Sequence, residues 1–225
     1  MPDSVRRTLP NAITLGRLLL ATAFFTVIAL GLSPTDATDR AAWGNTAVVL
    51  FSVAAASDVL DGYLARRWGV VTDFGRVMDP FVDKVLVLGA LVYLASPKFA
   101  EPEWTRAWGD PAPDRLINCA TGVASWMVVA MLGRELLVTS LRGVLEARGV
   151  GFAADLSGKV KMLVQSVGIP VTLAVAVNRG MLGSEGWRIG QAVAVWSMVG
   201  VTIASTVPYV VRGTRLLRSI SKGAA

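Results

Sequence analysis

The apolar residues of this 225-residue chain occur in long blocks rather than alternating with polar residues at amphipathic spacing. A block of about 17–25 apolar residues can cross a bilayer as an α-helix, and six blocks reach or approach that length. Their limits are Ala12 to Leu32, Ala41 to Ser57, Asp79 to Pro97, Leu116 to Gly133, Met162 to Asn178 and Ile189 to Val211. The pattern predicts an all-α, polytopic membrane protein with six transmembrane helices in a single domain, residues 1–225.

The third block is the weakest of the six, because its charge-free part extends only from Val85 to Pro97. It becomes long enough to span only if Asp79 and Asp83 belong to the same helix. Because proline is tolerated in the first turn of a helix, Pro80 leaves open whether this helix starts there or one turn earlier.

The basic residues predict which helix ends face the cytoplasm. Most of the 22 lysines and arginines lie at the two termini and in the second and fourth connections, whereas the other connections are about neutral. Because basic segments stay on the cytoplasmic side, we expect both termini there, in a bacterial-type inner or plasma membrane. Arg6 and Arg7 precede the first block as in a signal peptide, but the block is long and no small-x-small cleavage site follows. We therefore expect an uncleaved span.

Composition excludes several classes of function. The basic residues are dispersed between hydrophobic blocks, so we expect no nucleic-acid partner. The chain contains no histidine, which excludes histidine-based zinc sites and Ser-His-Asp triads. Its single cysteine, Cys119, excludes disulfides and cysteine metal clusters within one chain. No Walker-type phosphate loop is present, which argues against an ATP-driven pump.

Four aspartates, Asp58, Asp61, Asp79 and Asp83, lie between the second and third apolar blocks. The first two are three residues apart and the last two are four apart, so each pair shares one face if the stretch is helical. Unpaired carboxylates at membrane depth are costly, which makes such a cluster a functional hypothesis. Oxygen donors without histidine or cysteine suit a hard cation, Mg²⁺ or Mn²⁺. We predict that the aspartates hold metal against a phosphate-bearing substrate at the membrane surface.

Small residues and an arginine accompany the aspartates, in the pattern D-x2-D-G-x2-A-R-x8-G-x3-D-x3-D. Gly62, Ala65 and Gly75 lack bulk, so a ligand or a neighbouring helix can approach the backbone closely. Arg66 can bind phosphate oxygens with two hydrogen bonds. The alternative is that these charges only solvate the ends of the helices. That interpretation would suit two scattered aspartates, but not four at paired helical spacing with small residues between them.

The pattern resembles the signature of the CDP-alcohol phosphotransferases. The resemblance implies an integral membrane enzyme with six transmembrane helices, usually a homodimer, that transfers a substituted phosphate from a CDP-alcohol to a second alcohol and releases CMP. It also implies that the four aspartates bind one or two divalent ions and that Asp83 is the general base. Asp61, Gly62, Ala65 and Arg66, together with Gly75, would hold the cytidine nucleotide.

The first block opens with Asn11, Thr14 and Arg17 at helical spacing. One interpretation is an N-terminal cap followed by an arginine that extends to the membrane surface. The other follows from the family resemblance, since a similar start lies beside the nucleotide site, and it implies that Asn11 and Thr14 contact the nucleotide.

A second informative stretch contains Arg134, Arg142, Lys159 and Lys161. This stretch could be a basic cytoplasmic connection. However, Arg134 directly follows the uncharged run from Leu116 to Gly133, and the sequence after it is again apolar. Such an arginine either faces lipid at high cost or lines a polar pocket.

The same stretch resembles the subgroup of the family that makes phosphatidylglycerophosphate, except that Met162 replaces the usual threonine. The resemblance implies that the four cations bind the phosphate of glycerol 3-phosphate, and that the tails of CDP-diacylglycerol stay among membrane lipids. The site would then be a polar cavity facing the cytoplasm. Other acceptor alcohols of the family, namely inositol phosphate, serine and phosphatidylglycerol, remain alternatives. A divalent-cation transporter or channel and a structural scaffold are the alternatives from other classes.

Overall fold

The computed structural model describes residues 3–31, 37–68, 73–96, 99, 120–149, 156–178 and 184–223. The described side chains are those of residues 12–31, 39–58, 78–96, 99, 120–149, 157–178 and 184–216. The helices within these ranges are α1 (Asp3–Gly31), α2 (Ala37–Trp68), α3 (Asp73–Leu94), α5 (Ser125–Ala147), α6 (Leu156–Val177) and α8 (Glu185–Gly223). The described residues include no β-strand, so the all-α prediction is confirmed.

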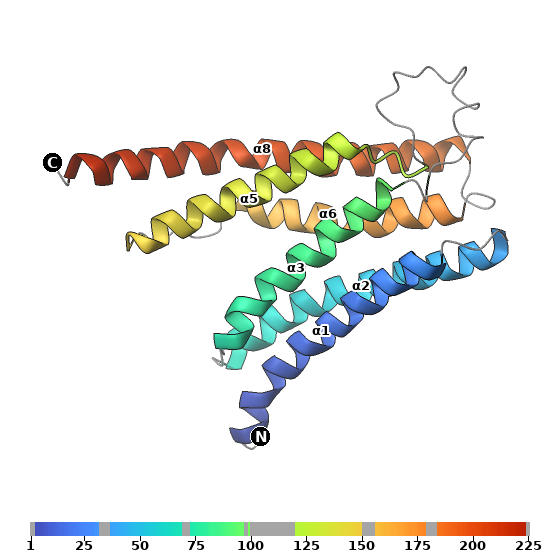
Figure 1. The fold of residues 1–225 in the computed structure, drawn as a ribbon, viewed down its shortest axis with the longest axis horizontal. Helices are drawn as coiled ribbons and strands as arrows, with labels where there is room; N and C mark the ends of the chain where they lie inside the picture. Colours follow the sequence, from blue (N-terminus) through green and yellow to red (C-terminus); the bar gives the residue numbers. More distant parts are fainter. Residues whose placement is uncertain are drawn as a thin grey trace.

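Successive helices alternate in direction. On one side of Figure 1 lie the N-terminal ends of α1, α3 and α6 and the C-terminal ends of α2, α5 and α8. Helix α1 packs on α2 and α3, α8 packs on α5 and α6, and α2 packs against α6 and so joins the two groups. Both chain termini therefore lie toward the same side of the bundle, as the alternating topology requires.

Helices α2 and α3 extend beyond the apolar blocks that predicted them. Helix α2 continues past Ser57 to Trp68, and α3 begins at Asp73 rather than Asp79. Both aspartate pairs therefore lie on α-helices, as their spacing predicted. Pro80 lies two turns inside α3, where its missing N–H removes one intrahelical hydrogen bond.

The predicted fourth segment, Leu116 to Gly133, begins outside the described residues, and its described part differs from the prediction where α5 begins. Residues 120–124 are not helical, because the Thr121 hydroxyl donates to the Leu94 carbonyl (2.7 Å) and accepts from the Val123 N–H (3.2 Å). Helix α5 then continues well past Gly133 to Ala147. It stops at Gly149, whose φ of 74° is a left-handed conformation that glycine adopts without a steric cost.

The six described helices all contribute to one apolar core, whose largest buried side chains include Phe24, Phe51, Leu91, Met127 and Met198. The rings of Phe24 and Phe51 are 5.5 Å apart, and Phe25 stacks on Tyr93 at 5.8 Å. The aromatic residues thus fix α1 against α2 and α3.

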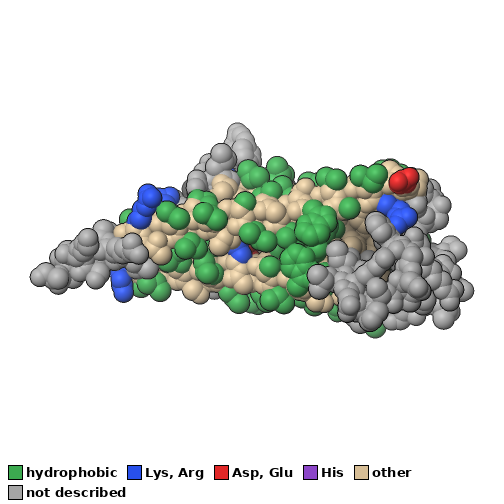
Figure 2. Space-filling view, turned by 90° about the horizontal axis from the view of Figure 1, so that it is seen from above, with side chains coloured by type: hydrophobic (Ala, Val, Ile, Leu, Met, Phe, Trp, Pro, Cys, Tyr) green, Lys and Arg blue, Asp and Glu red, His purple; other side chains and the backbone are tan. Residues whose placement is uncertain are grey.

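The molecular surface is itself largely apolar, with many exposed leucine, valine and tryptophan side chains. On the face drawn in Figure 2, hydrophobic side chains cover the middle of the molecule, and the visible charged side chains lie mainly toward its two ends. Within the described part of the chain, three stretches are long and apolar enough to cross a membrane: Ala12–Gly31, Ser157–Val177 and Glu185–Leu216. The chain is therefore an integral membrane protein.

Candidate active site

Arg17 is the centre of the first polar group. Only 1% of its surface is exposed, and its Nη1 lies 2.6 Å from Oδ1 of Asp58 on α2 and 4.0 Å from Oδ1 of Asp79 on α3. The Thr14 hydroxyl, one turn earlier on α1, donates to the same Asp79 oxygen at 2.8 Å. A lone arginine inside an apolar helix is costly, and the two carboxylates offset that cost. The group therefore ties three helices together at the level of the predicted metal ligands.

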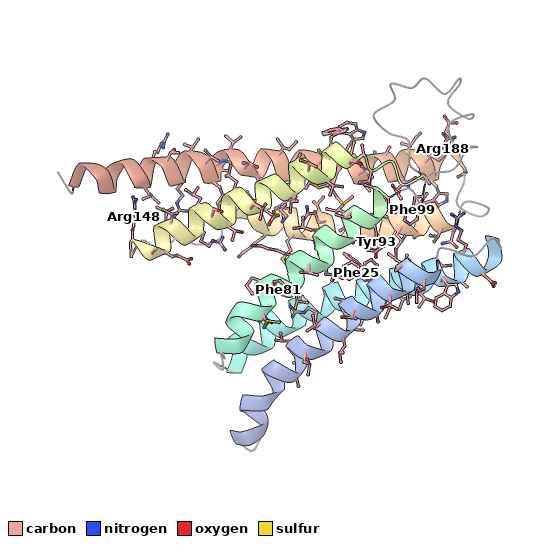
Figure 3. All side chains as sticks on the ribbon, viewed as in Figure 1. Phe25, Phe81, Tyr93, Phe99, Arg148 and Arg188 are labelled. Carbon is pink, nitrogen blue, oxygen red and sulfur yellow. The ribbon has the colours of Figure 1, made fainter. Side chains whose placement is uncertain are left out.

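Asp83 lies one turn after Asp79 on α3 and connects this group to a second one. The charges of Asp58 and Arg17 act on its carboxylate, and so do those of Lys161 and Glu135. In Figure 3 the labelled Phe81 marks the part of α3 that carries both aspartates. Asp83 is thus placed between an acid-rich group and a base-rich one.

The second polar group is built around Glu135 of α5. Its Oε1 accepts hydrogen bonds from Nη1 of Arg134 (2.9 Å) and from Nζ of Lys161 on α6 (2.7 Å). Helix α8 supports Arg134 from the other side. Nη2 donates to Ser205 Oγ at 3.1 Å, and the guanidinium lies 5.3 Å from the ring centroid of Tyr209. Arg134 is therefore held at two nitrogens and on one face.

Helix α6 presents a polar stripe toward α5 and α8. Gln165 lies one turn after Lys161 and is buried, and its Nε2 donates to Thr202 Oγ1 of α8 at 3.2 Å. The same nitrogen lies 3.7 Å from the sulfur of Met131 on α5. Gln165 thus connects α6 to α5, which carries Arg134, and to α8, which supports it.

The predicted phosphate-binding cations do not all come together. Arg134 and Lys161 share Glu135, as described above. Arg142 is half-buried, and its Nε has no hydrogen-bond partner within the described ranges. Lys159 is exposed and forms no ion pair with the described acids.

Six predicted site residues have side chains outside the described part of the chain. Their backbones belong to α1, α2 and α3, and they are Asn11, Asp61, Gly62, Ala65, Arg66 and Gly75. Their roles stay predictions.

The described residues fit a hard divalent cation in their donor chemistry. Asp58, Asp79 and Asp83 supply only oxygen donors, and the Thr14 hydroxyl orients one of them. Among the described side chains, no group of three or more His, Cys, Asp or Glu residues is close enough to hold a metal ion by itself. The fourth aspartate, Asp61, is not among these side chains, so the predicted set of four is not tested.

Comparison with known proteins identifies the family. A family model described as CDP-alcohol phosphatidyltransferase matches residues 7–207. The chain belongs to this family. It is therefore a transferase, and the resemblance seen in the aspartate pattern is confirmed.

Named relatives within the CDP-alcohol phosphatidyltransferase family are similar over most of the chain. A CDP-diacylglycerol–glycerol-3-phosphate 3-phosphatidyltransferase from Bacillus subtilis is 33% identical over 73% of this chain and 76% of its own length. A probable phosphatidylglycerophosphate synthase from Mycobacterium tuberculosis is 30% identical over 96% of this chain and 87% of its own length. A CDP-diacylglycerol–glycerol-3-phosphate 3-phosphatidyltransferase from Escherichia coli is 30% identical over 72% of this chain and 74% of its own length.

Four residues of this candidate site were given no site role from the sequence. Arg17 and Glu135 carry a signal, because each is a charge inside or directly after an apolar block. Ser205 and Tyr209 are one turn apart in a long apolar helix and carry no comparable signal. Only the packing of α8 on α5 identifies them as partners of Arg134.

Proposed function

We propose that the chain is a phosphatidylglycerophosphate synthase, which transfers the phosphatidyl group from CDP-diacylglycerol to glycerol 3-phosphate and releases CMP. The names of the relatives support this reaction. The observation that carries it is a pair of cations, the buried Arg134 and the half-buried Lys161, whose shared partner Glu135 acts electrostatically on Asp83. Cations in that position suit an acceptor alcohol that is itself phosphorylated.

In the membrane, we expect each of the six helices to span the bilayer as part of one domain, residues 1–225. The ends of α2, α5 and α8 that approach the polar groups would then face the cytoplasm, together with both termini and a polar cavity. The lipid tails of CDP-diacylglycerol would remain in the bilayer while its headgroup enters this cavity. We expect a homodimer by analogy with the family.

On the nucleotide side, two kinds of residue would contact CDP. Small residues let the nucleotide approach the backbone, and polar residues bind its phosphates and base. This set comprises Asn11, Thr14, Asp61, Gly62, Ala65, Arg66 and Gly75. Thr14 already donates to Asp79, so it would act at the border between nucleotide and metal.

One or two Mg²⁺ or Mn²⁺ ions would be held by Asp58, Asp61, Asp79 and Asp83. When bound, they would offset the charge of the diphosphate and polarise its P–O bonds. Arg17 holds two of the carboxylates in place from the side of α1. Its positive charge limits the repulsion between them.

In the transfer step, Asp83 accepts the proton of the acceptor hydroxyl. The hydroxyl oxygen forms a bond to the phosphorus that carries the diacylglycerol. The bond from that phosphorus to the oxygen shared with the cytidine phosphate breaks, and CMP leaves with the bonding electrons. Arg134 and Lys161 position the acceptor by its phosphate, so much of the acceleration comes from orientation.

An assay of CMP release tests this proposal. Purified enzyme in detergent receives CDP-diacylglycerol with glycerol 3-phosphate, inositol phosphate, serine or phosphatidylglycerol, each with and without EDTA. We expect release with glycerol 3-phosphate and none after chelation. Release with another acceptor instead would keep the chemistry and overturn the choice of substrate. Metal flux in liposomes without CMP would favour a cation transporter.

A further inference from the structure

Glu135 was not among the predicted site residues, yet it is the shared partner of two of them. One oxygen, Oε1, accepts from both Arg134 and Lys161, at 2.9 and 2.7 Å. Arg134 is buried and the other two side chains are half-buried, with 7% of Arg134 and 12% each of Lys161 and Glu135 exposed. They come from α5 and α6, which both pack on α8, so their mutual orientation depends on this contact.

The group contains two cations for one anion. A purely structural ion pair at this depth would be expected to balance its charge, because a net buried charge is costly. Asp83 acts on the group electrostatically, but the proposed function assigns that carboxylate to the acceptor hydroxyl and the metal. The Nε of Arg134 is buried and has no hydrogen-bond partner within the described ranges. One positive charge and one donor are thus left for a further anion.

Arg134 can offer this donor because its other contacts are fixed. Glu135 binds Nη1, Ser205 binds Nη2, and the ring of Tyr209 lies against the guanidinium. The ammonium of Lys161 has three N–H donors, of which Glu135 takes one. Without the carboxylate, the two cations would repel each other and turn apart.

We propose that Glu135 is a positioning residue for the acceptor phosphate. It holds Arg134 and Lys161 so that their remaining donors are presented to one phosphate group, and it thereby favours phosphorylated over unphosphorylated acceptors. This inference rests on the proposed function, since it assumes that these two cations bind the acceptor.

Glu135→Gln in the full-length enzyme tests the role, because the amide keeps the shape of the side chain and removes its charge. We expect the KM for glycerol 3-phosphate to rise about tenfold or more, and the KM for CDP-diacylglycerol to stay nearly constant. The preference for glycerol 3-phosphate over glycerol should narrow, and Glu135→Asp should restore part of it. Glu146→Gln on the same helix is the matched control. Glu146 is exposed, so the same change in charge should have little effect there.

A double-mutant cycle separates the loss of the shared contact from a general effect of Glu135→Gln on folding. With Lys161→Met already present, adding Glu135→Gln should raise the KM for glycerol 3-phosphate by less than it does in the wild type, because the shared contact is already lost. An unchanged KM in Glu135→Gln would overturn the inference. A lower KM would overturn it as well, since the carboxylate would then compete with the phosphate. If the unaltered enzyme releases no CMP with glycerol 3-phosphate, the proposed function itself fails.

Discussion

Arg17 and Asp58 form an ion pair of 2.6 Å between α1 and α2, at a position where the arginine is almost completely buried. Asp79 of α3 lies 4.0 Å from the same guanidinium nitrogen. One cation therefore connects two predicted metal ligands that lie on different helices, α2 and α3. The same contact serves the packing of three helices and the arrangement of the site.

Replacing Arg17 should therefore affect both activity and stability. Arg17→Met keeps the length of the side chain but leaves Asp58 and Asp79 without their cation. We expect CMP release to fall about tenfold to a hundredfold, as for residues that orient metal ligands. Because the carboxylates are partly exposed, the loss of stability should be about 2 kcal/mol rather than the larger cost of a fully buried pair.

The measurements are CMP release and the melting temperature in detergent. Arg148→Met is the control. It removes the same charge, and Arg148 is exposed at the end of α5. Figure 3 shows it at the far end of that helix. Full activity in Arg17→Met would show that the site does not depend on this ion pair.

The hydroxyl of Thr14 should tune metal binding through Asp79. Thr14→Val keeps the shape of the side chain and removes the donor at 2.8 Å, so the Mg²⁺ concentration for half-maximal activity should rise about tenfold. Thr14→Ser should remain close to the wild type. Thr22→Val is the control on the same helix, because Thr22 is exposed and its hydroxyl donates to the Leu18 carbonyl of its own helix. Equal metal dependence in both valine variants would contradict the prediction.

Asp83 should be needed for the chemical step. Asp83→Asn removes the proton acceptor, so the turnover number should fall about a hundredfold or more. Saturation-transfer or filter-binding measurements should still detect binding of CDP-diacylglycerol. Asp39→Asn, an exposed change in the first turn of α2, is the control. If Asp83→Asn releases CMP at the normal rate, the general base lies elsewhere.

The sequence predicted the helical blocks, and it predicted that both aspartate pairs lie on helices, because both features depend on local pattern. It predicted helix ends poorly, and the reason is physical. Hydropathy counts a charge such as Arg134 or Glu135 as a break, whereas in the folded chain the two charges pair and α5 continues through them. At Thr121 the opposite occurs, because a tertiary hydrogen bond to Leu94 stops an apolar segment from being helical.

The partners of the site were harder to predict than its charged residues. The aspartates are recognisable by type and spacing alone. Ser205 and Tyr209 matter only because α8 crosses α5 at the level of Arg134, and no local pattern encodes that crossing. Helix packing thus selects supporting residues that the sequence alone does not distinguish from other polar residues in a membrane helix.

The close approach of α6 and α8 at Gly158 gives a test of this support. A Cβ atom at Gly158 would lie 2.8 Å from the Tyr209 hydroxyl oxygen, which is too close for the ring to stay in place. Gly158→Ala should therefore push the ring away from Arg134 and raise the KM for glycerol 3-phosphate several-fold. Gly143→Ala on α5 is the control, because a Cβ there meets nothing within 4 Å. It should be neutral or stabilising by up to ~1 kcal/mol.

The double variant Gly158→Ala with Tyr209→Phe separates this contact from a general effect on α6. Phenylalanine keeps the ring beside Arg134 and removes the oxygen that the new methyl group would meet. The double variant should therefore recover most of the affinity for glycerol 3-phosphate that Gly158→Ala loses, measured as KM under the same conditions. If it is no better than Gly158→Ala alone, the tyrosine does not transmit the change. The first turn of α6 would then act on the acceptor by another route, such as the neighbouring Lys159.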